Sequence, residues 1–141
     1  MQKLKILFVC VHNSARSQMA EALLRNIASD KFEVESAGLE PRTLNPLAVA
    51  AMKQIGIDIS QNKTQSVSDL IKQGKTYDYV VTVCDESSSQ RCPFFPGESK
   101  KLHWGFVDPA SFSGSGEQKL EETVKVREQI KQKIQAWLKT L

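Results

Sequence analysis

The sequence predicts an α/β fold: a single three-layer domain in which a small parallel sheet of about four strands lies between layers of helices. Short apolar runs that suit strands alternate with longer stretches whose apolar residues recur at helical spacing. The first run, residues 4–9, is almost wholly apolar, as expected for a strand covered on both faces. The chain has 141 residues, 40% of them hydrophobic, so we expect residues 1–141 to form one domain.

The first half of the chain contains two strand and helix units. After the strand at 4–9, a helix is expected to begin near Ser17, where apolar residues follow at helical spacing: Met19, Ala20, Leu23, Leu24 and Ile27. FEVESAG, residues 32–38, is a short alternating strand that ends at Gly38. A second helix is expected to begin at Pro46 and to end at Gly56, since proline suits the first helical position and glycine the end.

The second half continues the alternation. SVSDLIKQ, residues 66–73, predicts a short helix with a serine cap, YDYVVTV at 77–83 predicts a strand, and KLHWGF at 101–106 predicts a last short strand. SFSGSGE at 111–117 predicts a surface loop. A terminal helix is expected from Glu117, with one apolar face formed by Leu120, Val124, Arg127, Ile130, Ile134, Trp137, Leu138 and Leu141.

Charge and hydropathy exclude several classes of function. The net charge of +3 comes from 19 basic and 16 acidic residues spread along the chain, which is too mild to predict nucleic-acid binding. The longest apolar stretches, at 4–11 and 79–83, fall far short of the roughly 18 residues of a membrane span, and no signal peptide is recognisable. We therefore expect a cytoplasmic protein without a membrane partner, by default a monomer. In that reducing compartment the three cysteines are not expected to form a structural disulfide framework.

The candidate functional site is the loop VCVHNSARS at residues 9–17. A loop between a strand and a helix N-terminus presents unpaired backbone N–H groups, so we expect an oxyanion to bind among Val11, His12, Asn13, Ser14, Ala15 and Arg16. Arg16 adds a planar fork of donors, and the same field favours a nucleophilic thiolate at Cys10, to which Ser17 can donate a hydrogen bond. Asn13 suits the left-handed turn such a loop needs. The alternative is a small buried cysteine beside a surface arginine.

On this loop and on NSARSQMAEALL, the SAG after the second strand, NPLAVAAMKQIGIDIS and Asp108–Pro109, the chain resembles the low-molecular-weight protein tyrosine phosphatase superfamily. The resemblance covers nearly the whole chain. It implies that Asp108 is the general acid that protonates the leaving group. An ordinary Asp-Pro turn is the alternative for that dipeptide alone.

Two branches of the superfamily are distinguished by the other two cysteines. Cys84 follows a predicted strand and Cys92 lies in a polar segment after it, a pair similar to that of the thioredoxin-coupled arsenate reductases, as is HWGFVDPA at 103–110. Tyrosine phosphatases of this size tend to have tyrosines directly after Asp-Pro, whereas Ala110, Ser111 and Phe112 stand here. The resemblance therefore implies an arsenate reductase, with a phosphatase as the alternative.

The reductase chemistry would use all three thiols. Cys10 would attack arsenate, Cys84 would then attack the sulfur of the adduct and release arsenite, and Cys92 would attack Cys84 to regenerate Cys10. Electrons are expected from thioredoxin, or from glutaredoxin and glutathione, with no tightly bound cofactor. A third hypothesis is a non-catalytic protein that senses oxyanions or holds a soft metal through Cys84, Cys92 and His103.

Some positions depart from the reductase pattern or extend it. Ala15 stands where a further cysteine often occurs, and His12 stands where a small residue is usual and is expected to be a solvent-exposed loop side chain. Asn13, Glu21 and Ser36 match family positions that order the loop from behind, and some relatives hold a monovalent cation there. For Glu21 and Ser36 an exposed helix glutamate and a strand-end cap are equally expected.

Overall fold

The computed structural model describes residues 3–84 and 95–141. Their strands form one four-stranded sheet in the order β2-β1-β3-β4. β1 (Leu4–Cys10) is central and pairs in parallel with β2 (Phe32–Gly38) and with β3 (Tyr79–Thr82), which pairs in parallel with β4 (Lys100–His103). The predicted parallel sheet of four strands is confirmed.

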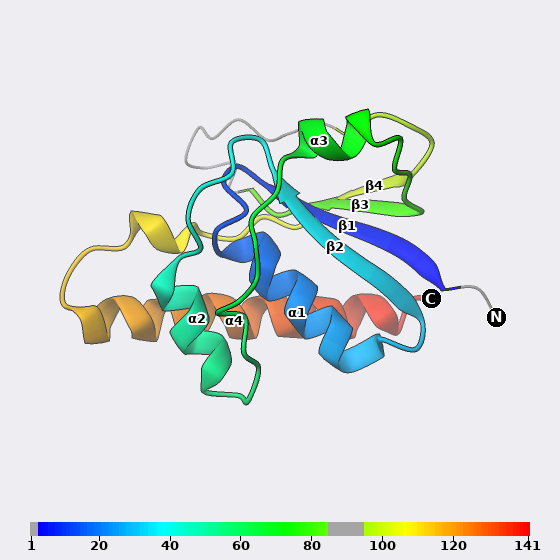
Figure 1. Ribbon diagram of the computed structural model, residues 1–141. Coiled ribbons are helices and arrows are strands. Elements are labelled where there is room, and N and C mark those ends of the chain that lie inside the picture. The colour runs from blue at the N-terminus through cyan, green and yellow to red at the C-terminus, as the bar shows by residue number, and fades with distance from the viewer. Residues whose placement is uncertain (1–2, 85–94) are drawn as a thin grey trace.

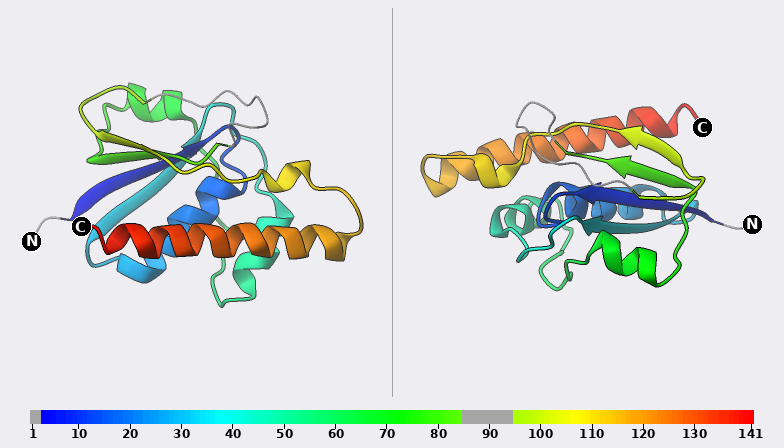
Figure 2. Two further views of the ribbon diagram at one scale, coloured as in Figure 1. Left: turned by 180° about the vertical axis from the view of Figure 1, so that it is seen from behind. Right: turned by 90° about the horizontal axis from the view of Figure 1, so that it is seen from above.

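Helices cover both faces of the sheet, as predicted, but unequally. Three helices, α1 (Arg16–Ala28), α2 (Pro46–Lys53) and α4 (Gly116–Leu138), lie on one side, and the short α3 (Val67–Lys72) lies on the other (Figures 1 and 2). Successive side chains of β1 therefore enter two different cores: Ile6 and Phe8 pack under the three helices, whereas Leu7 and Val9 pack under α3. This explains why the first strand is apolar without alternation.

The predicted start of α2 at Pro46 and the predicted serine cap of α3 are both present. Pro46 is the first residue of α2, and the Asn45 side chain accepts the Leu47 N–H at 2.9 Å. Ser66 caps α3 by accepting the Ser68 N–H at 3.1 Å. Helix α4 begins with a capping box, which sequence reasoning did not identify: Ser115 and Gln118 bond each other's backbone N–H.

The terminal helix differs in part from its prediction. It begins at Gly116, one residue before the expected start, and its fully buried positions are Thr123, Val126, Arg127, Ile130 and Ile134. Leu120 and Val124 are only half-buried, and Leu141 lies beyond the helix with 58% of its surface exposed. The predicted face is confirmed at Arg127, Ile130 and Ile134, and burial extends beyond it to Thr123 and Val126. Arg127 Nη1 donates to the Ala51 carbonyl of α2 at 2.7 Å.

The carboxyl ends of the strands gather the candidate residues. Cys10 and Gly38 are the last residues of β1 and β2, Cys84 follows β3 closely, and Asp108 follows β4 in the turn before a short 3₁₀ helix, η2 (Pro109–Ser111). Ligand sites of parallel sheets lie at this edge. Within residues 3–84 and 95–141, no helix combines the length and the apolar character that a membrane crossing requires.

Candidate active site

The loop between β1 and α1 has its peptide groups oriented by a neighbouring segment, residues 39–45. Four of its carbonyls point outward and accept N–H groups of that segment at 2.8–3.2 Å: those of Cys10, Val11, His12 and Ser14, from Leu39, Glu40, Arg42 and Asn45. The N–H of Asn13 instead points inward and donates to the Cys10 sulfur at 3.1 Å. Asn13 has φ 51°, the left-handed conformation predicted for it. A loop whose carbonyls are bound outward, with the Asn13 amide directed inward, is suited to hold an anion.

Gly38 allows this loop to lie against the end of β2. A Cβ built on Gly38 would lie 2.7 Å from the Asn13 nitrogen and 2.9 Å from both the His12 carbonyl carbon and the Val11 oxygen. No side chain fits there, so glycine is required by contact rather than by its own backbone conformation. The SAG sequence placed this glycine at the end of a strand, but nothing in the sequence indicated what it touches.

The Cys10 sulfur receives two hydrogen bonds at the base of the loop. It lies 2.9 Å from the Ser17 hydroxyl, the contact that the sequence predicted, and 3.1 Å from the Asn13 nitrogen. Ser17 accepts the Asn13 side-chain amide at 2.8 Å, so its own hydrogen is available to the sulfur. Two donors directed at one sulfur stabilise the thiolate, the nucleophilic form of cysteine.

Asn13 is held by partners on all sides, and it is fully buried. Its amide nitrogen donates to Ser17 and to Ser36, at 2.8 and 2.9 Å, and its oxygen accepts the Gln18 side chain at 3.2 Å and the Gln65 N–H at 3.0 Å. The amide therefore has one orientation, with nitrogen toward the hydroxyls. Sequence reasoning missed Gln18 and Gln65, and no pattern described above indicated either.

Glu21 extends this network away from the sulfur. Ser36 donates its hydroxyl to Glu21 Oε1 at 2.7 Å, and Arg25 Nη1 lies 3.1 Å from Oε2. Glu21 is only 9% exposed, so the expectation of an exposed helix glutamate is wrong. Burial raises the pKa of Glu21, and the bonds from Ser36 and Arg25 oppose that rise. At the predicted monovalent-cation position near Asn13, Glu21 and Ser36, the guanidinium of Arg25 thus already lies on Glu21.

Arg16 and Asp108 meet at the mouth of the loop. Arg16 is only 2% exposed; its Nη2 lies 3.3 Å from Asp108 Oδ2, and its Nη1 donates to the Phe106 carbonyl at 3.2 Å. The other carboxylate oxygen of Asp108 accepts the Ala110 N–H at 3.0 Å, which caps η2. The fold thereby brings the Asp108 carboxylate to the Arg16 guanidinium at the end of the Cys10 loop, although the two residues are distant in the chain.

Two further predicted residues lie near this edge. Cys84 is 1% exposed and belongs to the same apolar cluster as Cys10, together with Trp104 and Phe106. His12 is half-buried rather than solvent-exposed, and its Nδ1 lies 3.2 Å from the Glu40 carbonyl oxygen. Cys92 lies outside the described residues, so its place in a relay or in a soft-metal site stays a prediction. The described residues contain no cluster of three potential metal ligands.

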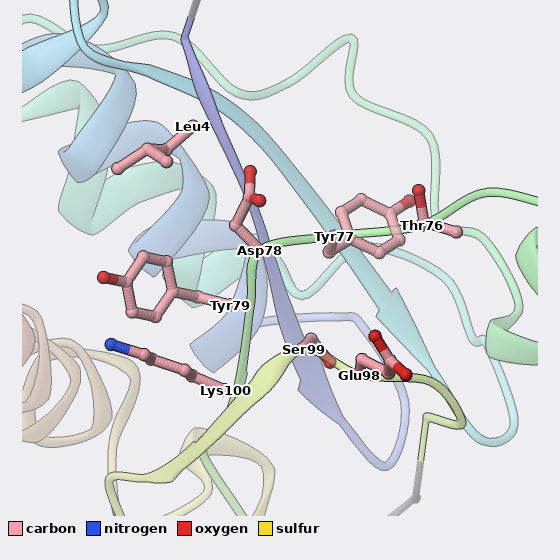
Figure 3. A pocket seen from close by; sticks show the side chains of 8 residues that line it. All are labelled: Leu4, Thr76, Tyr77, Asp78, Tyr79, Glu98, Ser99 and Lys100. Carbon is pink, nitrogen blue, oxygen red and sulfur yellow. The ribbon is translucent and has the colours of Figure 1, made fainter.

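A hollow of about 600 Å³ lies at the other end of the sheet, where β1, β3 and β4 begin (Figure 3). Its polar groups include Asp78, Tyr79 and Lys100. Asp78 already accepts the Lys5 N–H at 2.8 Å, and Lys100 Nζ lies 5.9 Å from the centre of the Tyr79 ring. Neither cysteine of the described residues lines this hollow, so it is separate from the Cys10 loop.

Gly38→Ala is expected to displace the loop, because the added methyl group would overlap the backbone of residues 11–13. We expect inorganic phosphate, used as a tetrahedral probe, to bind at least about tenfold more weakly, which corresponds to about 1.4 kcal/mol. Calorimetric titration of the folded variant measures this. Gly116→Ala is the matched control, since nothing lies within 4 Å of a Cβ at Gly116. Equal phosphate affinity of the Gly38→Ala variant and the parent would contradict the contact.

Glu21→Gln is expected to change the pH dependence of stability. Since burial raises the pKa of Glu21 above 4.5, the folded protein holds this proton more tightly than the unfolded chain does. The stability that the bound proton contributes is present at low pH and is lost as the pH rises through this range, by about 1.4 kcal/mol for each unit of pKa difference. Urea unfolding at pH 4 and pH 7 measures the free energy of unfolding of both proteins. The stability of the variant relative to the parent should be greater at pH 7 than at pH 4. The exposed Glu121→Gln should show no such gain.

The chain is similar over nearly its whole length to proteins named arsenate reductase. It is 41% identical over 141 residues to the arsenate reductase of Shouchella clausii (strain KSM-K16), with 99% of each chain covered. It is 42% identical over 137 residues to that of Bacillus subtilis (strain 168), with 96% of this chain and 95% of the relative covered.

The fold is also similar to those of solved structures. An arsenate reductase in the phosphate binding state matches with a TM-score of 0.75 at 30% identity, covering 99% of this chain and 98% of that one. The low molecular weight protein tyrosine phosphatase from T. tengcongensis matches with a TM-score of 0.76 over 99% of this chain and 100% of that one; at 24% identity this likeness concerns the fold alone. The family described as low molecular weight phosphotyrosine protein phosphatase matches residues 5–141, and the chain belongs to it.

Proposed function

We propose that this chain is an enzyme that reduces arsenate to arsenite. The observation that carries the proposal is the Cys10 sulfur at the base of a loop whose carbonyls are bound outward, with a second buried cysteine, Cys84, in the same cluster. The arsenate reductases at 41% and 42% identity over nearly the whole chain support the choice of substrate. Arsenate is a tetrahedral oxyanion, so the loop amides and Arg16 suit it.

The first step is a displacement at arsenic. The Cys10 thiolate attacks the arsenic atom, the sulfur–arsenic bond forms, and one arsenic–oxygen bond breaks. Asp108, in its protonated form, gives its proton to the departing oxygen, which leaves as water. Arg16 lies beside Asp108, so the acid and the anion-binding guanidinium reach the same reacting group.

The second step moves two electrons. The Cys84 thiolate attacks the sulfur of Cys10, the sulfur–arsenic bond breaks, and its electron pair stays on arsenic, which is released as arsenite. A Cys10–Cys84 disulfide remains. Cys92 then attacks Cys84, which regenerates the Cys10 thiolate, and thioredoxin reduces the Cys84–Cys92 disulfide; glutaredoxin with glutathione is the alternative donor. We place the reaction in the cytoplasm, where such donors are kept reduced.

A phosphatase remains the second candidate because Cys10, Arg16 and Asp108 alone are sufficient for it. A phosphate ester would form a Cys10–phosphate adduct, which water would then hydrolyse. The residues after Asp108 argue against a phosphotyrosine substrate: Ala110 and Ser111 are small and exposed, and they offer no aromatic wall for a substrate ring. The two functions differ in whether thiols other than Cys10 are needed.

Arsenate-dependent oxidation of NADPH is the direct test, with the purified chain, thioredoxin and thioredoxin reductase. We expect sustained oxidation that requires arsenate, because each turnover consumes two electrons. Hydrolysis of p-nitrophenyl phosphate is measured on the same sample. Cys10→Ser should abolish both reactions. Ester hydrolysis with no arsenate-dependent oxidation would favour the phosphatase.

The relay predicts a particular defect for Cys92→Ser. Without Cys92 the Cys10–Cys84 disulfide has no internal attacker, so we expect at most one arsenite released per protein molecule with the thioredoxin system. Arsenite is counted in a rapid-quench time course. Cys84→Ser should release none through this route. Sustained turnover by the Cys92→Ser variant would rule out the relay while leaving the first displacement intact.

A further inference from the structure

The predicted monovalent-cation position behind the Cys10 loop would use oxygen atoms of Asn13, Ser36 and Glu21. A cation such as K⁺ is held where several oxygen atoms together replace its hydration shell. Whether these three residues suit a cation therefore depends on the bonds that their oxygens already make.

Donors of the chain already bond the oxygens of Asn13 and Ser36. The side-chain oxygen of Asn13 accepts the Gln18 amide at 3.2 Å and the Gln65 N–H at 3.0 Å, which uses both of its lone pairs. The Ser36 carbonyl accepts the Gln65 side-chain amide at 2.8 Å. The Ser36 hydroxyl accepts the Asn13 amide and donates to Glu21. These oxygens therefore face N–H groups where a cation would need free lone pairs.

Arg25 bonds the remaining oxygen of this position. Its Nη1 lies 3.1 Å from Glu21 Oε2, and its Nη2 donates to the Val34 carbonyl of β2 at 2.7 Å. These two contacts hold the guanidinium in place, although 55% of the side chain is exposed. Glu21 Oε1 accepts the Ser36 hydroxyl, so both carboxylate oxygens have partners on the chain. A guanidinium carries one permanent positive charge, the same charge as K⁺.

The charges around Glu21 are balanced without an added ion. Burial raises the pKa of Glu21, and the charge of nearby Glu35 adds to that rise. The Glu35 carboxylate is itself held by Lys75 Nζ at 3.1 Å and by the Tyr77 hydroxyl at 3.2 Å. Each of these two carboxylates thus has a cationic partner on the chain. A K⁺ ion placed beside Glu21 would be repelled by the charge of Arg25.

We infer that Arg25 is a positioning residue that takes the place of a monovalent cation behind the Cys10 loop. Its guanidinium holds Glu21, and Glu21 holds the Ser36 hydroxyl in the direction that lets it accept the Asn13 amide. Asn13 in turn donates its backbone N–H to the Cys10 sulfur. The order of the loop then comes from the chain itself and not from the salt around it. This holds for arsenate and for a phosphate ester alike, so the inference goes beyond the proposed function.

Unfolding in different salts tests the inference on the full chain. Urea unfolding is measured at pH 7 in choline chloride, KCl or NaCl, each at about 200 mM so that screening is equal. The parent should have the same unfolding constant in all three salts, within about twofold. In Arg25→Ala the Glu21 carboxylate lacks its guanidinium at a place only 9% exposed, which a small cation can enter and choline cannot. A cation bound there with a Kd of about 50 mM would lower the unfolding constant of the variant about fivefold.

Two further variants control for general effects of the substitution. Arg25→Lys keeps a positive charge beside Glu21, so its unfolding constant should be as independent of the cation as that of the parent. Lys125→Ala breaks an exposed pair on α4, in which Lys125 Nζ lies 3.0 Å from Glu122 Oε1. Water solvates that carboxylate, so this variant should be equally stable in KCl and in choline chloride.

The reactivity of Cys10 tests the positioning role. The chain with Cys84→Ser and Cys92→Ser retains Cys10 as its one cysteine. Its alkylation by iodoacetamide at pH 7 is followed by mass spectrometry in the same salts, and the rates should be equal. With Arg25→Ala added, the rate should be at least about twofold higher in KCl than in choline chloride, because a cation beside Glu21 restores the bonds that hold Asn13 against the thiolate.

Any of three results would overturn the inference. The first is a parent chain that KCl or NaCl stabilises by more than about twofold in its unfolding constant. The second is an Arg25→Ala variant that is equally stable in all three salts. The third is an Arg25→Ala chain whose Cys10 reacts equally in KCl and in choline chloride. None of these measurements uses arsenate, so the proposed function and the inference can fail separately.

Discussion

The candidate site depends on one constraint: the carbonyls of Cys10, Val11, His12 and Ser14 are turned away from the centre of the loop. Residues 39–45 impose this by donating four backbone N–H groups to those carbonyls. If the loop became ordered only when an anion bound, its affinity for the anion would be lower, because fixing each backbone residue costs about 1–2 kcal/mol. Here the folded chain meets that cost before any ligand binds, as in other preorganised anion sites.

The preorganised loop is connected to the core through a single amide. Asn13 adopts a left-handed backbone and uses both ends of its side chain, so the direction of each hydrogen bond around it is fixed. Ser17 can then give its hydrogen to the sulfur, while Ser36 gives its own to Glu21. Removing one member would leave a buried polar group unsatisfied, at a cost of about 1–3 kcal/mol. The surroundings of the Cys10 sulfur therefore depend on side chains behind the loop, among them Ser36 and Glu21.

A feature of the fold or of the candidate site could be predicted when it depends on residues close together in the sequence. The parallel sheet, the loop and the Ser17 contact lie within short stretches whose pattern is visible in the sequence. Gly38 and Gln65 contact the loop only because distant segments of the chain fold against it. The sequence around each residue does not indicate that contact. Arg127 was predicted on the buried face of α4, but its partner was not: the Ala51 carbonyl belongs to another helix, and hydropathy does not indicate a contact between distant segments.

The ion pair of Arg16 with Asp108 places a carboxylate beside the position where the proposed oxyanion would bind. The two groups are 2% and 11% exposed, so their attraction is screened less than at the surface. An incoming oxyanion offers Arg16 a second negative partner and places its charge near the Asp108 carboxylate. Because Arg16 would then contact both negative groups, it would offset part of the repulsion between them. The contact between Arg16 and Asp108 thus holds the proposed acid beside the proposed anion-binding group before any substrate arrives.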